Sequence, residues 1–420
     1  MNSTTAFQKS TAYLQFLCEE LPERSVGSEG NRCATAFFQQ TVSALGWETE
    51  TTLLEVMDWQ EEGATLRAGE RVFEVRVSPY ALGCAVKARL MSAATLEELE
   101  RQDVAGSVLL LHGELAREQL MPKNFVFYNP QEHQHIIALL EQKQPAALVC
   151  ATGRNAAVAG GVYPFPLIED GDFDIPSVYL TAEDGQELLS CVGTIVQLES
   201  RSDRIPAQAY QVIARRGENP DQRIVISAHI DAKKGTPGAM DNASGVVVLL
   251  LLAEHLRSYQ GGITLELIPF NGEDYYAVPG QMAFLRQNQG RLHTIRLNIN
   301  IDGAGYKEGK TALSFFNLPE ALHAHMVQIL TRYKGLTEGA PWYQGDHSIF
   351  LQQGIPAVAV TSQWYLENME TQDITHTPKD CPEIVDPWKL VEVAEALSAF
   401  IHGLADAPQD RFLRDSSPSL

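Results

Sequence analysis

The fold is decided by residues 223–257, RIVISAHIDAKKGTPGAMDNASGVVVLLLLAEHLR. The first part, Arg223 to Ala228, is a short run that is apolar on both faces, as is typical of a fully buried β-strand. The last part, Ser244 to Arg257, has the length and apolar content of a buried helix. The stretch therefore predicts a strand, a loop and a helix in succession, with His229 where the strand ends.

The same alternation continues along the second half of the chain. Strands that are apolar on both faces and joined by helices are typical of a parallel sheet covered on both sides. We therefore predict an α/β fold with a mixed, mainly parallel central sheet flanked by helices. The further strands expected are Ile263 to Phe270, Ile295 to Ile301 and Ala357 to Thr361, and the further helices are Thr11 to Leu21, Asn31 to Leu45, Gly280 to Gln287, Pro319 to Tyr333 and Pro387 to Ile401.

The chain has 420 residues, which is long for a single core, so we expect more than one domain. Residues 79–200 differ from the rest, because short strands alternate there with short helical segments and a Gly/Pro-rich loop. We predict that this segment is a smaller, β-rich α+β insert. Residues 1–78 and 201–408 would form the main catalytic domain, and residues 409–420 a flexible polar tail.

Composition restricts the classes of function. The net charge of −21 argues against a nucleic-acid partner, since phosphate binding needs a basic face, and it suits cationic substrates. The longest apolar run, Val246 to Ala253, is too short to span a bilayer, and the N-terminus does not resemble a signal peptide. Six cysteines are scattered without a CxxC pair. We therefore expect a cytoplasmic location, no membrane association and no cysteine-based zinc site.

Five residues of the second half are candidate metal ligands, and three of them come directly after predicted strands. Imidazole and carboxylate groups together suit Zn²⁺ or a similar divalent ion. Two histidines and three carboxylates are one ligand too many for a single tetrahedral zinc, but they suit two ions that share a bridging carboxylate. The candidates are His229, Asp241, Asp274, Asp302 and His376, with Glu273 beside them as a candidate base.

Each of these residues also has a structural interpretation. Asp241 precedes a helix start and would serve as an N-cap, and the helix dipole opposes a cation there. His376 would be an ordinary surface histidine. Glu273 and Asp274 are adjacent acids that repel each other unless cations compensate. The ordered set, with histidine first and last and acids between, favours metal-assisted hydrolysis.

In this ordered set the chain resembles the family of di-zinc aminopeptidases that also contains glutamate carboxypeptidase and glutaminyl cyclase. The matching stretches are HID (229–231), TPGAMDNASGV (236–246), FNGED (270–274), NINIDG (298–303), GDHSIFLQQGIPAV (345–358) and THTPKD (375–380). The insert resembles the protease-associated domain of many members, in GSVLLLHG (106–113) and IPSVYLTAEDGQELL (175–189). The resemblance therefore covers nearly the whole chain.

The resemblance implies the roles of the metal ligands. His229 and Asp302 would hold one zinc ion, Asp274 and His376 the other, and Asp241 would bridge both. The departure from the family is Asp274, where many members carry glutamate. An aspartate is shorter by one methylene, so it must either bring its backbone closer or hold the second ion weakly.

The resemblance also implies roles for residues beside the ligands. Glu273 corresponds to the general base that takes a proton from a water activated between the two zinc ions. Asp231 corresponds to the acid that accepts the other N–H of His229 and fixes its tautomer. Asp346 and His347 would line the substrate side of the pocket, orienting substrate or stabilising the oxyanion.

The function expected is hydrolysis of N-terminal residues from peptides by a zinc metallopeptidase. The resemblance leaves open a carboxypeptidase or dipeptidase, for which Arg286 or Arg296 would bind the terminal carboxylate. It also leaves open a glutaminyl cyclase-like enzyme and a non-catalytic binding protein on a peptidase scaffold. Side-chain preference, the role of the insert and the subunit number do not follow from the sequence.

Overall fold

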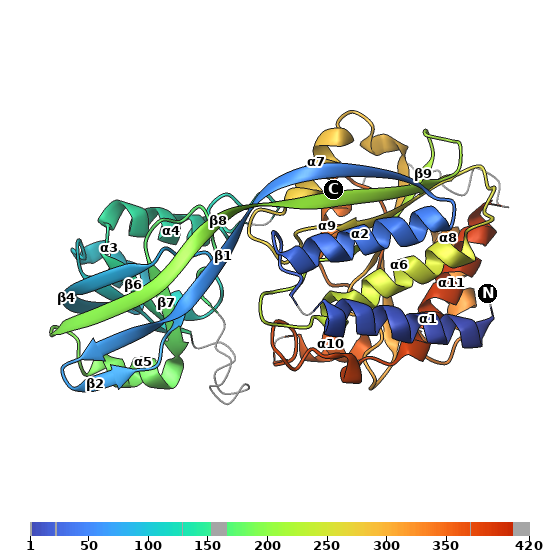
Figure 1. The fold of residues 1–420 in the computed structure, drawn as a ribbon. Coiled ribbons are helices and arrows are strands. Elements are labelled where there is room, and N and C mark those ends of the chain that lie inside the picture. The colour runs from blue at the N-terminus through green and yellow to red at the C-terminus, as the bar shows by residue number, and fades with distance from the viewer. Residues whose placement is uncertain (1, 22, 128, 153–165, 370, 406–420) are drawn as a thin grey trace. The chain divides into compact units, whose positions relative to one another are not determined.

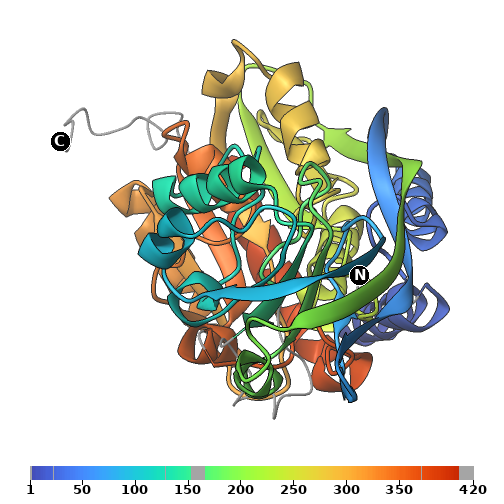
Figure 2. The ribbon, with the colours of Figure 1, turned by 90° about the vertical axis from the view of Figure 1, so that its left-hand side faces the viewer.

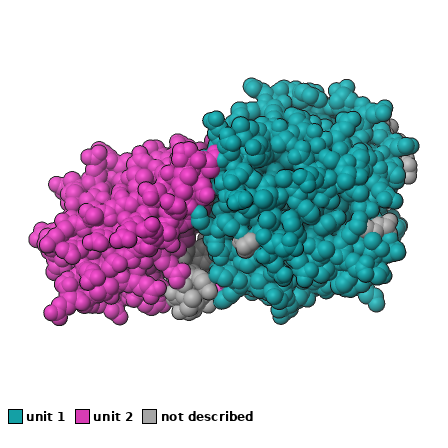
Figure 3. Space-filling model, in the orientation of Figure 1, with its two compact units in different colours: residues 1–56, 208–370, 374–420 teal, residues 57–207, 371–373 magenta. Residues whose placement is uncertain are grey.

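The computed structural model describes all residues except 1, 22, 128, 153–165, 370 and 406–420. It divides into two compact units (Figure 3). Unit 1 comprises residues 1–56, 208–370 and 374–420, and unit 2 comprises residues 57–207 and 371–373. The domain boundaries at 78/79 and 200/201 stay predictions, and the tail expected from residue 409 lies outside the described residues.

Unit 1 is built on a mixed, mainly parallel sheet with the strand order β13-β12-β14-β11-β9-β10-β8 (Figure 1). β14, β11, β9 and β10 run parallel to one another, whereas β12 is antiparallel to β14 and β8 is antiparallel to β10. The predicted fold class is confirmed. The strand bounds are β8 Ile195–Arg216, β9 Arg223–His229, β10 Thr264–Phe270, β11 Ile295–Ile301, β12 Thr311–Phe316, β13 Leu336–Glu338 and β14 Ala357–Ser362.

The central strands are buried on both faces, which explains their apolar sequences. Every residue of β9, β10 and β14 is buried. Successive side chains point to opposite faces of a sheet. Leu265 and Leu267 of β10 accordingly join one core cluster, while Phe270 stacks with Phe284 and Phe350 on the other side. Both faces therefore need helices to cover them.

One face is covered by helices α1, α2, α6, α8 and α11, and the other by α7 and α9 (Figure 1). All residues of α6 from Ser244 to Ala253 are buried, because this helix lies between the sheet and the helices outside it. The bounds are α1 Ser3–Gln15, α2 Glu29–Ala44, α6 Ser244–His255, α7 Pro279–Gln287, α8 Glu320–Leu330, α9 His347–Leu351, α10 Gln363–Asn368 and α11 Pro387–Ala405.

The observed bounds of the central strands match the predicted bounds more closely than those of the first helix do. The helix expected over Thr11 to Leu21 instead begins at Ser3, because the Asn2 side chain accepts the backbone N–H of Thr5 and caps it there. A π-helical turn, Phe16–Glu20, follows. No described helix has the length and apolar content needed to cross a membrane.

Unit 2 contains a second parallel array, β4-β5-β6-β7, with antiparallel partners at its two ends, β8 beside β4 and β3 beside β7. Helices α3 and α4 cover one face and α5 the other (Figures 1 and 2). The long strands β1 and β8 contribute residues to both units. The bounds are β1 Glu48–Ala68, β2 Arg71–Phe73, β3 Arg76–Val77, β4 Cys84–Ala93, β5 Val108–Leu111, β6 Ala147–Thr152, β7 Ser177–Thr181, α3 Leu96–Arg101, α4 Gln131–Lys143 and α5 Ala182–Leu189.

Candidate metal centre

Three of the predicted ligands lie at one edge of the unit 1 sheet. His229 is the last residue of β9, Asp302 directly follows β11, and Asp274 lies four residues beyond the end of β10. β9 pairs in parallel with both β10 and β11, so the carboxyl ends of the three strands are adjacent. This edge is where parallel α/β sheets bind ligands.

Asp241 reaches the same edge from the turn Ala239–Ala243 that precedes α6. The next residue, Asn242, anchors this turn, because its side chain donates to the Ile301 carbonyl at 2.9 Å and accepts the Gly245 N–H at 2.9 Å. A Cβ on Gly245 would lie 2.5 Å from the Ile301 carbonyl oxygen, so only glycine permits this approach of α6 to β11. The turn is thereby fixed next to Asp302.

His376 comes from the loop between α10 and the 3₁₀ turn Pro382–Ile384. Its backbone has φ 62°, a left-handed conformation that is rare for residues other than glycine and that clusters at functional sites. About a third of its side chain is exposed (33%), against 1% for His229. Of the two imidazoles, His376 is therefore the one open to solvent.

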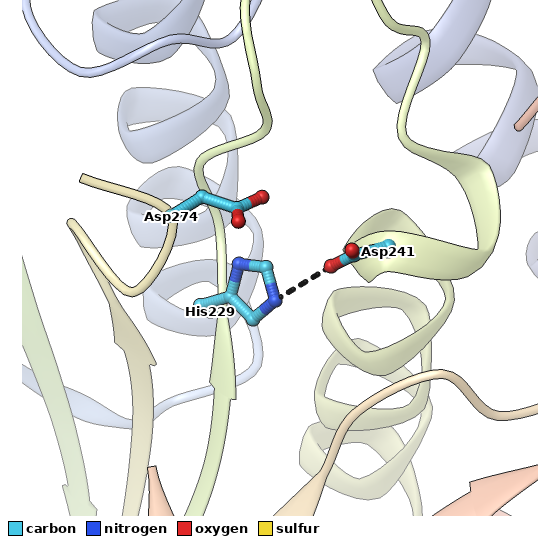
Figure 4. A group of neighbouring side chains, drawn as sticks. All are labelled: His229, Asp241 and Asp274. Atoms are coloured by element: carbon cyan, nitrogen blue, oxygen red, sulfur yellow. Dashed lines mark ion pairs between the residues drawn. The ribbon is translucent and has the colours of Figure 1, made fainter. Parts of the chain in front are cut away.

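The structure brings all five predicted ligands together (Figure 4 shows three of them). His229 Nε2 lies 3.0 Å from Asp241 Oδ1 and 3.5 Å from Asp302 Oδ1. His376 Nε2 lies 3.1 Å from Asp241 Oδ2 and 3.1 Å from Asp274 Oδ1. Asp241 thus faces a different imidazole with each of its carboxylate oxygens.

Charge–charge interactions dominate this cluster. Burial lowers the pKa of both histidines, but Asp302 and its neighbours raise the pKa of His229 well above its usual range, and Asp274 and Asp241 do the same for His376. Burial raises the pKa of Asp241, yet hydrogen bonds from the two histidines lower it overall. In the metal-free protein, protonated imidazoles supply the positive charge that the carboxylates need, and metal binding would release those protons.

In two further acids, burial outweighs the attraction of His229. Removal from water raises the pKa of Glu273 well above its usual range, and it also raises that of Asp302, although His229 lowers both. Asp274 Oδ2 is buried and has no hydrogen-bond partner. Three ligand atoms, one each from His229, Asp241 and Asp274, lie within 4.8 Å of one another. Imidazole and carboxylate donors with an unsatisfied buried oxygen fit zinc.

Asp231 is held differently from the arrangement that the sequence suggested. Its carboxylate accepts the backbone N–H groups of Gly272, Glu273 and Asp274 at 2.8, 3.3 and 3.0 Å. His229 Nδ1 lies 3.2 Å from the backbone carbonyl oxygen of Asp231 and 3.7 Å from its carboxylate. Asp231 therefore orients His229 mainly through its backbone, while its carboxylate holds the loop that carries Glu273 and Asp274.

The shorter Asp274 is brought into the cluster by its backbone position. Lys233 Nζ donates to the Asp274 carbonyl at 2.8 Å, on the side opposite the N–H that Asp231 binds. Burial raises the pKa of Asp274, but His376 and Lys233 outweigh burial and the nearby Asp241 and lower it. The 3.1 Å contact with His376 follows from this placement. How strongly the shorter side chain of Asp274 holds a second ion stays a prediction.

Comparison with known proteins identifies the peptidase part. The profile of peptidase family M28 matches residues 211–401. These residues belong to peptidase family M28. The fold of the whole chain is similar to that of an aminopeptidase from Aneurinibacillus sp. strain AM-1, with a TM-score of 0.76, 19% identity and coverage of 98% of this chain and 96% of the other.

Two further proteins are similar to this chain. A zinc aminopeptidase from Bacillus subtilis superposes with a TM-score of 0.73 at 16% identity, covering 96% of each chain. Aminopeptidase YwaD from Bacillus subtilis (strain 168) is 21% identical over 248 residues, which are 56% of this chain and 53% of YwaD. The chain thus spans about half the length of this curated relative.

Asp346 and His347 lie in the M28 domain at the start of α9, and both are buried. Gln281 Nε2 donates to Asp346 Oδ1 at 2.7 Å, and burial raises the pKa of Asp346 to about 7. His347 Nε2 lies 2.8 Å from the Trp342 carbonyl oxygen, and burial lowers its pKa to about 4. His347 is thus a buried imidazole held by the Trp342 carbonyl, and its role toward substrate stays a prediction.

Of the two arginines considered for a carboxylate-binding role, Arg296 lies away from the cluster. It is the second residue of β11, six residues before Asp302 and therefore about 20 Å from it along the strand. Arg286 lies in the last turn of α7, a helix that begins five residues after Asp274. The placement of Arg296 lends no support to recognition of a terminal carboxylate.

Some residues near the cluster were missed in the sequence. Burial raises the pKa of the Tyr365 hydroxyl on α10, and the carboxylates of Asp241, Asp302, Glu273 and Asp274 raise it further. Asp380 contacts the Asp241 turn directly. Asp380 was visible in THTPKD, four residues after His376, but Tyr365 carries no comparable signal.

Proposed function

We propose that the chain is a zinc-dependent aminopeptidase that hydrolyses N-terminal residues from peptides. The observation that carries the proposal is the convergence of His229, His376 and three aspartates on one sheet edge of an M28 domain, with Glu273 in the same loop as Asp274. The aminopeptidase names of the Aneurinibacillus and Bacillus proteins support the same activity.

The proposed metal complement is two zinc ions. His229 and Asp302 would hold one ion, and Asp274 and His376 the other, with Asp241 shared between them. This division is supported by Asp241, whose Oδ1 lies 3.0 Å from His229 and whose Oδ2 lies 3.1 Å from His376. When bound, zinc supplies Lewis acidity, which polarises a carbonyl and lowers the pKa of water toward neutrality.

Glu273 is the residue we assign to proton transfer. Its loop is fixed by the Asp231 carboxylate through three backbone N–H groups, so the Glu273 side chain starts from a defined position. Its carboxylate accepts the proton of the attacking water and later gives that proton to the departing amine. Burial raises the pKa of Glu273 well above its usual range, which suits an acid–base group.

The net charge of the chain favours a free α-amino group on the substrate. Two zinc ions would offset the carboxylates of the centre itself, but the whole chain carries a net charge of −21. A substrate ammonium is attracted to such a protein, whereas a terminal carboxylate is repelled. The position of Arg296 also favours an aminopeptidase over a carboxypeptidase.

A substrate screen tests the proposal. We expect the full chain to release chromophore from aminoacyl p-nitroanilides, to leave the N-acetylated forms intact, to lose activity with 1,10-phenanthroline and to regain it on zinc addition. Zinc binding without cleavage of any substrate would contradict the proposal and favour a binding protein on a peptidase scaffold. Cleavage of only N-blocked substrates would favour a carboxypeptidase or dipeptidase.

The proposal also covers the domain type of the insert. We assign the 79–200 segment to a protease-associated-like domain, because its four-stranded parallel array has helices on both faces and carries the GSVLLLHG and IPSVYLTAEDGQELL stretches on β5, β7 and α5. Its removal from the chain would test whether hydrolysis by the M28 domain depends on it.

A further inference from the structure

A buried carboxylate, Asp380, contacts the turn that carries Asp241. Asp380 is fully buried (0% exposed) and accepts the backbone N–H of Met240 at 2.7 Å and of Asp241 at 3.0 Å. Its backbone carbonyl accepts the N–H of Ala239 at 3.2 Å. Each carboxylate oxygen therefore binds one N–H, which fixes the backbone of this turn relative to Asp380.

Asp380 also belongs to the loop that carries His376, four residues earlier. A second contact joins the same two loops, since Thr236 Oγ1 donates to the Thr377 carbonyl at 2.9 Å. His376 itself has a left-handed backbone (φ 62°) and lies outside any helix or strand. Its position therefore depends on contacts of this kind, and those of Asp380 link it to Asp241.

The Asp241 turn is held from the N-terminal segment as well. Arg24 is 1% exposed and donates to the Pro237 carbonyl at 2.7 Å and the Gly238 carbonyl at 2.9 Å, as well as to two further backbone carbonyls. Arg24 and Asp380 are both buried, and both bind backbone atoms of the same short segment. Two buried polar side chains bound to one segment indicate that its geometry is tightly specified.

We propose that Asp380 is a positioning residue of the metal centre, which holds Asp241 and His376 in register so that both face the same ions. This inference rests on the proposed function. Asp241 is the residue whose two oxygens reach two different imidazoles, so a small displacement of its backbone weakens both contacts. Groups that orient metal ligands in this way set metal affinity without touching the ion.

Asp380→Asn tests the proposal in the full chain. The amide keeps the size of the side chain but replaces one acceptor by a donor, which would then face a backbone N–H. We expect the zinc dissociation constant, measured on chelator-stripped protein by competition with a chromogenic chelator, to rise about tenfold to hundredfold. Turnover of an aminoacyl p-nitroanilide should recover at saturating zinc, because the ligands and Glu273 are intact.

The chain offers a matched control in Asp170. This aspartate of unit 2 is 2% exposed and accepts two backbone N–H groups, from Lys123 at 2.6 Å and Asp172 at 2.8 Å. Asp170→Asn should leave zinc affinity unchanged even where it lowers the melting temperature. If Asp380→Asn does not fold, Asp380→Glu keeps the charge and displaces the carboxylate, and it should weaken zinc binding too.

The outcomes separate this inference from the proposed function. Zinc affinity equal to wild type in a folded Asp380 variant, or an equal weakening in Asp170→Asn, would overturn the positioning role. A wild-type chain that binds no zinc at all would overturn the proposed function and this inference with it. Weakened zinc binding confined to the Asp380 variants is the expected result.

Discussion

The Asp231 carboxylate accepts the backbone N–H of Asp274 at 3.0 Å, while the backbone carbonyl of Asp231 lies 3.2 Å from Nδ1 of His229. One residue therefore contacts both the end of β9 and the loop after β10. Because His229 and Asp274 are proposed to hold different ions, Asp231 links the two halves of the proposed centre.

Asp231→Asn should reduce both activity and zinc retention. The amide can accept with one oxygen only, so at least one of the three N–H groups that Asp231 binds would lose its partner. We expect kcat/KM for an aminoacyl p-nitroanilide to fall about tenfold to hundredfold, the usual cost of losing a group that orients a metal ligand. Steady-state kinetics with zinc analysis checks this, and unchanged values in both would contradict the role of Asp231.

Glu273→Gln should abolish turnover without loss of metal. Glutamine keeps the shape of the side chain but does not accept the proton of the attacking water. We expect kcat to fall about 10²- to 10⁴-fold while zinc content stays at the wild-type value. The variant Glu254→Gln, which removes a part-buried ion pair with Lys9, is the control for a lost carboxylate and should keep wild-type kcat. Wild-type turnover in Glu273→Gln would refute the general-base assignment.

The sequence predicted the parallel centre of the unit 1 sheet better than its edges. The central strands are buried on both faces and therefore appear in the sequence as short continuous apolar runs, which made them recognisable; they are β9, β10, β11 and β14. The long strand β1, by contrast, alternates exposed and half-buried residues and contains a glycine, and its pairing with β2 depends on contacts outside its own segment. Such strands give no comparable signal.

The residues of the candidate site also differ in how clearly the sequence indicated them. His229 and Asp302 were identifiable because a polar residue that ends a buried strand has few structural explanations. Asp380 and Gln281 act through contacts with the backbone of Asp241 and the side chain of Asp346, 139 and 65 residues away along the chain. Contacts over such separations exist only in the folded protein. The sequence therefore showed Asp380 in THTPKD without its role, and it gave no signal for Gln281.

Asp274→Asn should leave one zinc ion per chain in place of two. The proposed second site consists of His376, Asp274 and the shared Asp241, and a neutral amide is a poor zinc ligand. His229 and Asp302 are unchanged, so the first ion should stay bound. Zinc analysis of protein dialysed against dilute zinc measures this, with the exposed Asp221→Asn as control. Two ions in Asp274→Asn, or one in wild type, would contradict the proposed assignment.

His347 should make the chain less stable in acid. Burial lowers its pKa from 6.5 to about 4, so between these values the unfolded chain binds a proton that the folded chain does not. The contribution of the neutral imidazole to the free energy of unfolding is fully present above pH 6.5. As the pH falls, the free energy of unfolding decreases by about 3 kcal/mol in total. We therefore expect the free energy of unfolding of wild type to fall by about 3 kcal/mol more than that of His347→Gln between pH 7 and pH 4. Urea unfolding of chelator-treated protein measures this difference. The exposed His135→Gln is the control variant. Parallel pH curves for wild type and His347→Gln would contradict the prediction, because they would show that this imidazole takes up its proton over the same pH range in the folded and unfolded chains.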